Sequence, residues 1–196
     1  MNRFAAATAL ALVPATAVLA EPVEYSLDSS HSQIVFHYDH LGFSTGYGMF
    51  SGFDGTIMFD QEDPANSSVE VSFPVRSMMT GWEGRFEHFM SEDFFGAEEG
   101  DMVTFTSTGI EVIGEETAEI TGELSMNGVT NEVVLDAQLN KAGSHPMENK
   151  PWAGFSATTT VLRSDYNLGM FAPAVSDEVE IEISVEAMEG QPETDS

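Results

Sequence analysis

The chain has 196 residues, a length that suits one domain with a sizeable core, and it contains no cysteine. No disulfide can therefore stabilise the fold, and no thiol is available for chemistry. Acidic residues number 33 against 6 lysines and arginines, giving a formal net charge of −27. Such a surface repels phosphate backbones and argues against nucleic acid as a partner. We expect the charge to keep the protein soluble, with steering of a cationic partner as the alternative.

Residues 1–20 have the pattern of a secretory signal peptide. Arg3 supplies a positive charge, residues 4–13 form a short apolar run, and small or tolerated residues precede a cleavage site at Ala20. Residues 15–17 offer a competing cleavage site. The apolar run is too short for a comfortable membrane span. We therefore expect export to the periplasm, cleavage near Ala20 and no stable membrane anchor.

Two segments that follow alternate between apolar and polar residues, which predicts a pair of strands. The first segment alternates at Ile34, Phe36 and Tyr38, and the second alternates at Ile57 and Phe59. The sequence between them, HLGFSTGYG, is rich in glycine and predicts a loop. Strands joined by a glycine-rich aromatic loop are typical of the mouth of a β-barrel, which can enclose an apolar ligand.

The rest of the chain predicts more strands and one helix. Phe86, Phe89 and Met90 recur at spacings of three and four, so a short helix with an aromatic face is expected to lie over the barrel. Asn127-Gly128 is a strong signal for a hairpin turn. Other segments with strand patterns are 23–28, 69–74, 103–113, 118–128, 129–141, 154–163 and 178–188. We predict an all-β fold, an extended antiparallel barrel of about eight strands in one domain (21–188), with a flexible acidic tail (189–196).

The chemically active residues form no recognisable catalytic or metal-binding motif. His37 and His40 would point to opposite faces of a strand, and neither an HxH nor an HExxH pattern is present. Ser30, His31 and Ser32 are adjacent in sequence, but adjacency does not build a catalytic triad, and no GxSxG elbow occurs. We expect no metal, no cofactor and no enzymatic activity.

Three arginines of the mature chain, Arg76, Arg85 and Arg163, lie in or beside aromatic segments. One interpretation is a polar clamp on a ligand headgroup such as a phosphate or a quinone carbonyl. The favoured interpretation is a set of structural ion pairs, Arg85 with Glu83, Glu92 or Asp93 and Arg163 with Asp165.

Several ordered motifs make the chain resemble the YceI-like family over about residues 23–188. They are DSSHS at 28–32, HLG at 40–42, GMF at 48–50, the segment RFEHFMSEDFF at 85–95, TFTST at 104–108, GELSMNGVT at 122–130, GFSA at 154–157 and RSDY at 163–166. The chain departs from the family pattern at Phe86, where an acid is usual, and at Phe89, where leucine is usual.

The resemblance implies a lipocalin-like barrel that holds long apolar molecules, notably polyisoprenoids such as quinone tails or polyprenyl phosphates. It also implies export to the periplasm and a link to stress responses or to the handling of lipid carriers. It supplies no catalytic residues. An isoprenoid or similar lipid is therefore the expected ligand and partner, and a homodimer is a further expectation.

Two groups of residues are expected to contact this ligand. Inward strand faces would line the tunnel with Ile34, Phe36, Tyr38, Ile57, Phe59, Val71, Phe73, Phe105, Leu124, Met126, Leu135 and Phe155. The mouth would be closed by Phe43, Phe50, Trp82, Phe89 and Phe95, with His40 and Arg85 beside it. A stress-linked interaction protein with a packed interior is the second hypothesis, and an enzyme acting on a lipid or carrying a haem-like cofactor is the third.

Overall fold

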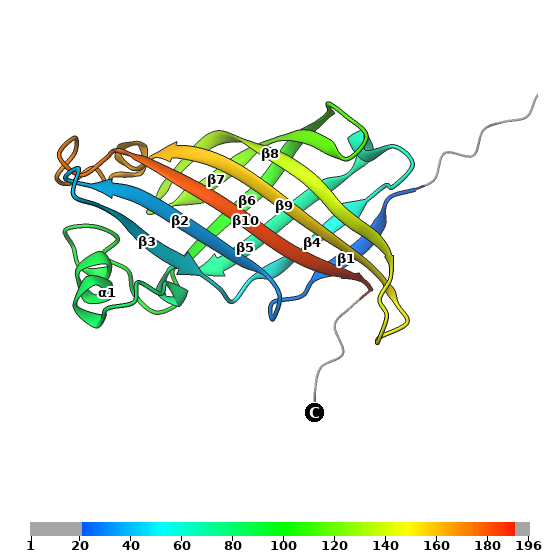
Figure 1. The fold of residues 1–196 in the computed structure, drawn as a ribbon, viewed down its shortest axis with the longest axis horizontal. Helices are drawn as coiled ribbons and strands as arrows, with labels where there is room; N and C mark the ends of the chain where they lie inside the picture. The colour runs from blue at the N-terminus through cyan, green and yellow to red at the C-terminus, as the bar shows by residue number, and fades with distance from the viewer. Residues whose placement is uncertain (1–20, 191–196) are drawn as a thin grey trace, which may run out of the picture.

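A computed structural model describes residues 21–190. The predicted signal peptide and residues 191–196 of the predicted tail lie outside the described residues. Ten antiparallel strands and one α-helix make up the fold (Figure 1). The strands are β1 Val23–Leu27, β2 Gln33–His40, β3 Ser44–Phe50, β4 Asp54–Phe59, β5 Ser68–Pro74, β6 Met102–Val112, β7 Thr117–Met126, β8 Val129–Ser144, β9 Pro151–Leu162 and β10 Glu178–Glu189. The helix α1 spans Glu83–Met90, and short 3-10 helices occur at Pro64–Asn66, Val75–Ser77 and Arg163–Tyr166.

Eight of these strands close a barrel. The hydrogen-bonded order runs β1-β4-β5-β6-β7-β8-β9-β10, and β10 pairs back with β1 through Ser26 opposite Met188 and Leu27 opposite Ala187. The hairpin β2–β3 joins the other half of β10, where Ile181 lies opposite Phe36. The expected barrel of about eight strands is confirmed, and the hairpin lengthens its wall on one side.

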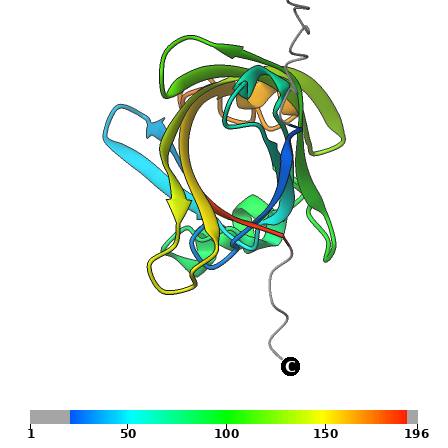
Figure 2. The same ribbon diagram turned by 90° about the vertical axis from the view of Figure 1, so that its right-hand side faces the viewer.

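The two ends of the barrel differ. We call one the helix end: it carries the β2–β3 tip (41–43), the segment 75–101 with α1, and the β9–β10 loop (163–177) (left in Figure 1). The opposite end, here the turn end, carries the β4–β5, β6–β7 and β8–β9 connections and faces the viewer in Figure 2.

The segment 75–101 extends the barrel wall at the free edge of β3. Met49 in β3 and Met79 exchange two backbone hydrogen bonds, with N···O distances of 2.9 and 2.8 Å. Phe86, Phe89 and Met90 of α1 pack against the main apolar core. The helix therefore forms where the three- and four-residue spacing predicts it, with its aromatic face turned inward.

A local sequence signal sets the turn between β7 and β8. The predicted turn between β7 and β8 is confirmed: Asn127 and Gly128 both have positive φ, 51° and 74°, as a tight hairpin turn of this type requires.

β10 runs to Glu189, and the N–H of Gly190 donates to the carbonyl of Glu24 at 3.1 Å. Ordered structure therefore continues beyond residue 188, where the tail was expected to begin.

The expected glycine-rich loop is mostly strand. Only residues 41–43 turn, and β3 begins at Ser44, so that Gly46 lies opposite Tyr38 and Gly48 opposite Phe36. The loop prediction was wrong because these glycines do not bend the chain. They receive the aromatic rings of the neighbouring strand, a role that composition alone does not distinguish from flexibility.

Candidate ligand-binding cavity

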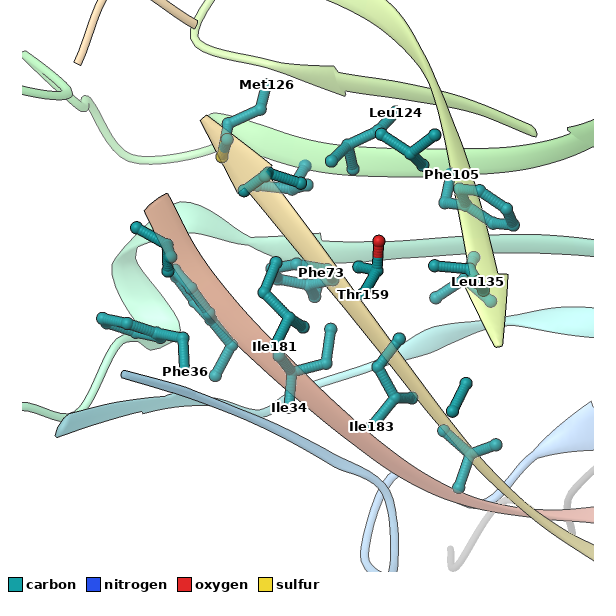
Figure 3. Close-up of a pocket in the computed structure, with 18 of the residues that line it drawn as sticks. Ile34, Phe36, Phe73, Phe105, Leu124, Met126, Leu135, Thr159, Ile181 and Ile183 are labelled. Carbon is teal, nitrogen blue, oxygen red and sulfur yellow. The ribbon is translucent and has the colours of Figure 1, made fainter. Parts of the chain in front are cut away.

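An elongated cavity of about 800 Å³ occupies the barrel, with lining residues at both the helix end and the turn end. Side chains from β2, β5, β6, β7, β8, β9 and β10 point into the same space, as the labelled residues of Figure 3 show. They are almost entirely apolar: isoleucine, leucine, methionine and phenylalanine, with Thr159 as a polar exception. The volume lies in the upper part of the range usual for small-molecule pockets.

All but one of the residues expected to contact a ligand lie on this cavity. From the strands come Ile34, Phe36, Tyr38, His40, Phe50, Ile57, Phe59, Val71, Phe73, Phe105, Leu124, Met126, Leu135 and Phe155, and from the segment 75–101 come Trp82, Arg85, Phe89 and Phe95. Phe43 is the exception: it is 89% exposed at the β2–β3 tip and does not line the cavity. The structure thus brings the set together in space, while ligand contact itself stays a prediction.

Aromatic rings stack along one wall. Phe50 contacts Phe36 and Phe73, with ring centroids 5.4 and 5.1 Å apart, and Phe53 continues the row 5.0 Å from Phe73. These contacts hold the rings in fixed positions, because neighbouring aromatic rings favour tilted and edge-on arrangements at such distances. The wall is therefore preformed before any ligand is present.

Glycines let some of these rings lie flat against the sheet. A Cβ atom at Gly48 would overlap the ring of Phe36, one at Gly46 would overlap Tyr38, and one at Gly122 would overlap Phe105. Each ring therefore covers the backbone of the adjacent strand. Because the rings lie along the wall, they leave the bore open.

Most of the wall formed by β8, β9 and β10 was missing from the predicted lining, which included only Leu135 of β8 and Phe155 of β9. This wall also contributes Val133, Ala137, Leu139, Ala157, Thr159, Val161, Val179, Ile181, Ile183 and Val185. The signal was present in β10, where four of these residues alternate with glutamates and Ser184 on the outer face. The alternation identified an inward face, but strand order, which fixes which faces share one space, is not visible in a single sequence.

The helix end supplies two arginines and two histidines to the lining. Arg85, Arg163, His40 and His88 all lie on the cavity there. Arg85 donates from Nη1 to the carbonyl oxygen of Thr80 at 3.1 Å, so its side chain is anchored beside the N-terminus of α1. His88 packs edge-on against Phe94, with ring centroids 5.0 Å apart.

Arg163 is buried and holds the β9–β10 loop together. Its guanidinium donates to the carbonyl oxygens of Leu168, Met170, Val175 and Ser176. Burial lowers the pKa of Arg163 from its usual value, although an arginine remains protonated at neutral pH.

The arginine ion pairs expected from the sequence are therefore replaced by other contacts. Arg163 donates to four carbonyls, and the carboxylate that acts on it electrostatically is Asp177, not Asp165. Arg85 bonds a carbonyl as well. Carbonyl acceptors come from the irregular backbone around each arginine, so sequence spacing alone did not reveal them.

The turn end has the opposite electrostatic character. The cavity there is bordered by the β6–β7 connection and its neighbours, with the polar residues Ser67, Glu115, Glu116, Thr117 and Gln138. Arginine side chains therefore lie at one end of the apolar bore and carboxylates at the other. A ligand with an anionic or carbonyl-bearing head and an apolar tail would find the helix end more favourable for its head.

The Ser30–His31 segment does not form a catalytic triad. Ser30 Oγ lies 3.0 Å from His31 Nδ1, and Asp28 Oδ2 lies 2.6 Å from the same nitrogen. A triad needs the hydroxyl and the carboxylate on opposite ring nitrogens. The group instead fixes the turn that precedes β2, and it lies outside the cavity lining.

Asp28 and His31 shift each other's pKa in this turn. Burial raises the pKa of Asp28, but hydrogen bonds from Ser30 and His31 outweigh burial and leave that pKa below its usual value. The hydrogen bond to Asp28 in turn raises the pKa of His31. Glu186 lies close enough for the three side chains to share a cation, although its carboxylate already accepts a 2.8 Å hydrogen bond from Trp152 Nε1.

Within residues 21–190, no helix combines the length and apolar character that crossing a bilayer requires.

Sequence comparison places the chain among known proteins. The model of the YceI-like domain matches residues 25–187. A UPF0312 protein of Pectobacterium carotovorum is 37% identical over 177 residues, covering 90% of this chain and 91% of that protein. Protein YceI of Escherichia coli O157:H7 is 38% identical over 168 residues, covering 85% of this chain and 87% of that protein.

Solved structures share the fold. The YceI protein of Campylobacter jejuni is 30% identical with a TM-score of 0.70, covering 78% of this chain and 90% of its own. BcnA of Burkholderia cenocepacia is 22% identical with a TM-score of 0.73, covering 82% of this chain and 98% of its own. A polyisoprenoid binding domain of Saccharophagus degradans is 15% identical with a TM-score of 0.63, covering 86% and 99%. With a family model that spans nearly the whole barrel and relatives of this similarity, the chain belongs to the YceI-like family.

Proposed function

We propose that the protein binds and carries a long apolar lipid, most simply a polyisoprenoid with a quinone or polyprenyl phosphate head, inside the barrel. The observation that carries this proposal is the preformed apolar cavity of about 800 Å³ along the barrel. The polyisoprenoid binding domain of Saccharophagus degradans has the same fold, which supports this ligand class by analogy.

Apolar burial supplies the driving force. Removing apolar surface from water stabilises the complex by roughly 25 cal/mol per Å², before the cost of ordering the chain is subtracted. Each five-carbon unit that enters the bore therefore adds a few kcal/mol at most. Affinity should depend on the number of isoprene units more than on the chemistry of the head.

The head of the ligand should lie at the helix end. Arg85 and His40 are placed there to approach a phosphate or a carbonyl, whereas Glu115 and Glu116 border the opposite end. An anionic head at the turn end would face carboxylates and lose Coulombic stabilisation. In this arrangement Arg85 acts as a polar clamp on the ligand head while it also donates a hydrogen bond to the Thr80 carbonyl.

The proposal includes a role in binding without catalysis, action in the periplasm after removal of the signal peptide, and a link to stress responses through the carried lipid. A homodimer is compatible with it. The alternative of an interaction protein with a packed interior predicts no continuous cavity, and the cavity of about 800 Å³ counts against it.

Two substitutions at adjacent positions of β9 test the proposal. Ala157 lines the cavity between Ala137 of β8 and Ile183 of β10, whereas Thr158 is exposed on the outer face. Ala157→Phe adds bulk to the bore, and Thr158→Phe adds the same bulk outside it. We expect Ala157→Phe to weaken binding of a long-chain ubiquinone at least tenfold, measured by titration in detergent solution.

The Thr158→Phe variant should bind the long-chain quinone with the same affinity as the unchanged protein. Equal affinity in both variants, with circular dichroism showing an intact fold, would place the ligand outside the bore and overturn the proposal. A short-chain quinone gives a further control, because it needs less of the bore and should be affected less by Ala157→Phe.

A further inference from the structure

We infer that the helix end is a membrane-docking surface that holds the cavity mouth against a bilayer of zwitterionic lipids. This inference rests on the proposed function, since a long apolar lipid has negligible solubility in water and must enter from a bilayer. It adds a surface, an orientation and a lipid preference to that function.

Exposed apolar side chains gather around the mouth. The apolar rim consists of Leu41, Phe43, Trp82, Met170 and Phe171, which come from three separate segments of the helix end. Phe43 is 89% exposed and Trp82 is 67% exposed. Large aromatic side chains this open to water are costly unless they meet an apolar or interfacial partner, and tryptophan favours the bilayer interface.

The rim is continuous with the cavity. Trp82, Met170 and Phe171 line the cavity and are exposed as well. A backbone hydrogen bond ties the end of β2, next to the β2–β3 tip, to the β9–β10 loop: the N–H of Ser176 donates to the carbonyl of Asp39 at 3.0 Å. A lipid that leaves a bilayer through this rim would therefore pass directly into the bore.

Backbone conformation sets two rim residues apart. Five non-glycine residues in the described part of the chain have positive φ, and three of them are asparagines, which tolerate this conformation. The other two are Leu41, with φ of 61°, and Phe171, with φ of 66°. Bulky residues seldom adopt such angles, and strained backbone of this kind concentrates at functional sites. Here it holds two apolar side chains at the rim.

The two ends also differ in the chemistry of their exposed apolar residues. The turn end exposes the aliphatic residues Val23, Ile113 and Met147, whereas the rim carries Phe43, Trp82 and Phe171. Aromatic rings suit the interfacial zone of a bilayer better than aliphatic side chains do.

Charge selects the kind of bilayer. The formal net charge of −27 opposes approach to anionic lipids, and Glu83, Glu87 and Asp93 lie on or beside α1 at this end. Phosphatidylcholine or phosphatidylethanolamine surfaces carry no net charge and leave apolar insertion as the dominant force.

Vesicle binding with a single fluorescent tryptophan tests the inference. Trp82 and Trp152 are the two tryptophans, and Trp152 does not line the cavity or belong to the rim, so Trp152→Phe leaves Trp82 as the reporter. We expect phosphatidylcholine vesicles to shift the Trp82 emission to shorter wavelength, and brominated phosphatidylcholine to quench it. Phosphatidylglycerol vesicles should give a weaker response at low salt.

Matched variants separate the rim from general apolar exposure. Phe43→Ser and, as a second rim variant, Leu41→Ser should each weaken vesicle binding several-fold to about tenfold. Met147→Ser removes a residue that is 76% exposed at the turn end and should leave vesicle binding unchanged. Neither Phe43 nor Leu41 lines the cavity, so uptake of quinone from detergent should be the same in all three variants.

The outcomes are distinct. If quinone is taken up from detergent while Trp82 shows no vesicle response, or if Met147→Ser weakens vesicle binding as much as Phe43→Ser, the docking surface is wrong and the proposed function stands. If substitutions in the rim disrupt a dimer of the protein but leave vesicle binding unchanged, the rim is a dimer interface and the inference is overturned. If no quinone enters from detergent, the proposed function itself fails.

Discussion

Glycine residues opposite aromatic rings control how much of the bore is open. Phe36, Tyr38 and Phe105 each lie over a glycine of the adjacent strand, and any side chain at that glycine would collide with the ring. The width of the cavity is thus set by small residues as much as by the large ones that face it.

Gly48→Ala tests this arrangement. The added methyl group overlaps the Phe36 ring, so the ring must turn away from the wall, and its free direction is the cavity. We expect a loss of about 1–3 kcal/mol in the free energy of unfolding from overpacking, and weaker binding of long-chain quinones.

A second substitution at the ring provides the control. Phe36→Leu combined with Gly48→Ala should recover most of the lost stability, because the smaller side chain removes the overlap. Gly109→Ala, where an added Cβ has no neighbour within 4 Å, should be close to neutral. Denaturant unfolding of the unchanged protein, Gly48→Ala, the double variant and Gly109→Ala measures these differences in stability. A Gly48→Ala variant as stable as the unchanged protein would contradict the close contact between Gly48 and Phe36.

The Asp28–His31 pair predicts a pH-dependent stability. The hydrogen bond to Asp28 raises the pKa of His31 in the folded protein above its ordinary value of 6.5, so its contribution to stability is present below 6.5 and is lost as pH rises through the folded pKa. The pKa of Asp28 is lowered from 3.8, so its contribution is present above that value and is lost as pH falls through the folded pKa. The pair therefore stabilises the fold most between these limits.

His31→Ala should accordingly lower the melting temperature more at about pH 5 than at about pH 9. In an Asp28→Asn background the same substitution should lose this pH dependence, since the charged partner is absent. A His31→Ala effect of equal size at both pH values would show that the hydrogen bond between the two side chains does not depend on their charges.

At the scale of elements, the hairpin between β7 and β8 depends on a two-residue turn. Gly128 has φ of 74°, and a Cβ there would meet no atom within 4 Å. Gly128→Ala therefore introduces backbone strain without a clash and should cost about 1 kcal/mol of folding stability. Thermal unfolding should show a lower midpoint than for Gly109→Ala, and an unchanged midpoint would mean that the turn relaxes without cost.

Patterns confined to one element were predictable from the sequence. The alternation at Ile34, Phe36 and Tyr38 identified a face that lines the cavity, and the spacing of Phe86, Phe89 and Met90 identified α1. Both follow from the geometry of the local backbone.

Features that depend on contacts between distant segments were missed. β3 was hidden because Gly46 and Gly48 favour a loop when they are considered alone. Arg163 was assigned an ion pair because its carbonyl partners come from the folded β9–β10 loop. Phe43 was expected to contact the ligand because it lies in an aromatic stretch, whereas the β2–β3 tip turns its side chain out to solvent, away from the cavity.

At the scale of the whole molecule, an apolar bore runs through a strongly acidic shell. The formal net charge of −27 resides on a protein whose inward faces are almost entirely apolar (Figure 3). In the proposed function, this separation keeps the protein soluble while the lipid stays out of water. Arginines line the cavity at the helix end and carboxylates border it at the turn end, which gives the bore a direction.

Native mass spectrometry of the mature protein, purified from its own host and followed by lipid extraction, tests the central claim most directly. We expect a bound mass that matches a quinone or another polyprenyl species and that disappears on extraction. The fraction of protein that carries this mass should fall in Ala157→Phe and stay the same in Thr158→Phe. A protein that carries no lipid and takes up no added isoprenoid would contradict it, and would favour an interaction protein whose cavity has no lipid ligand.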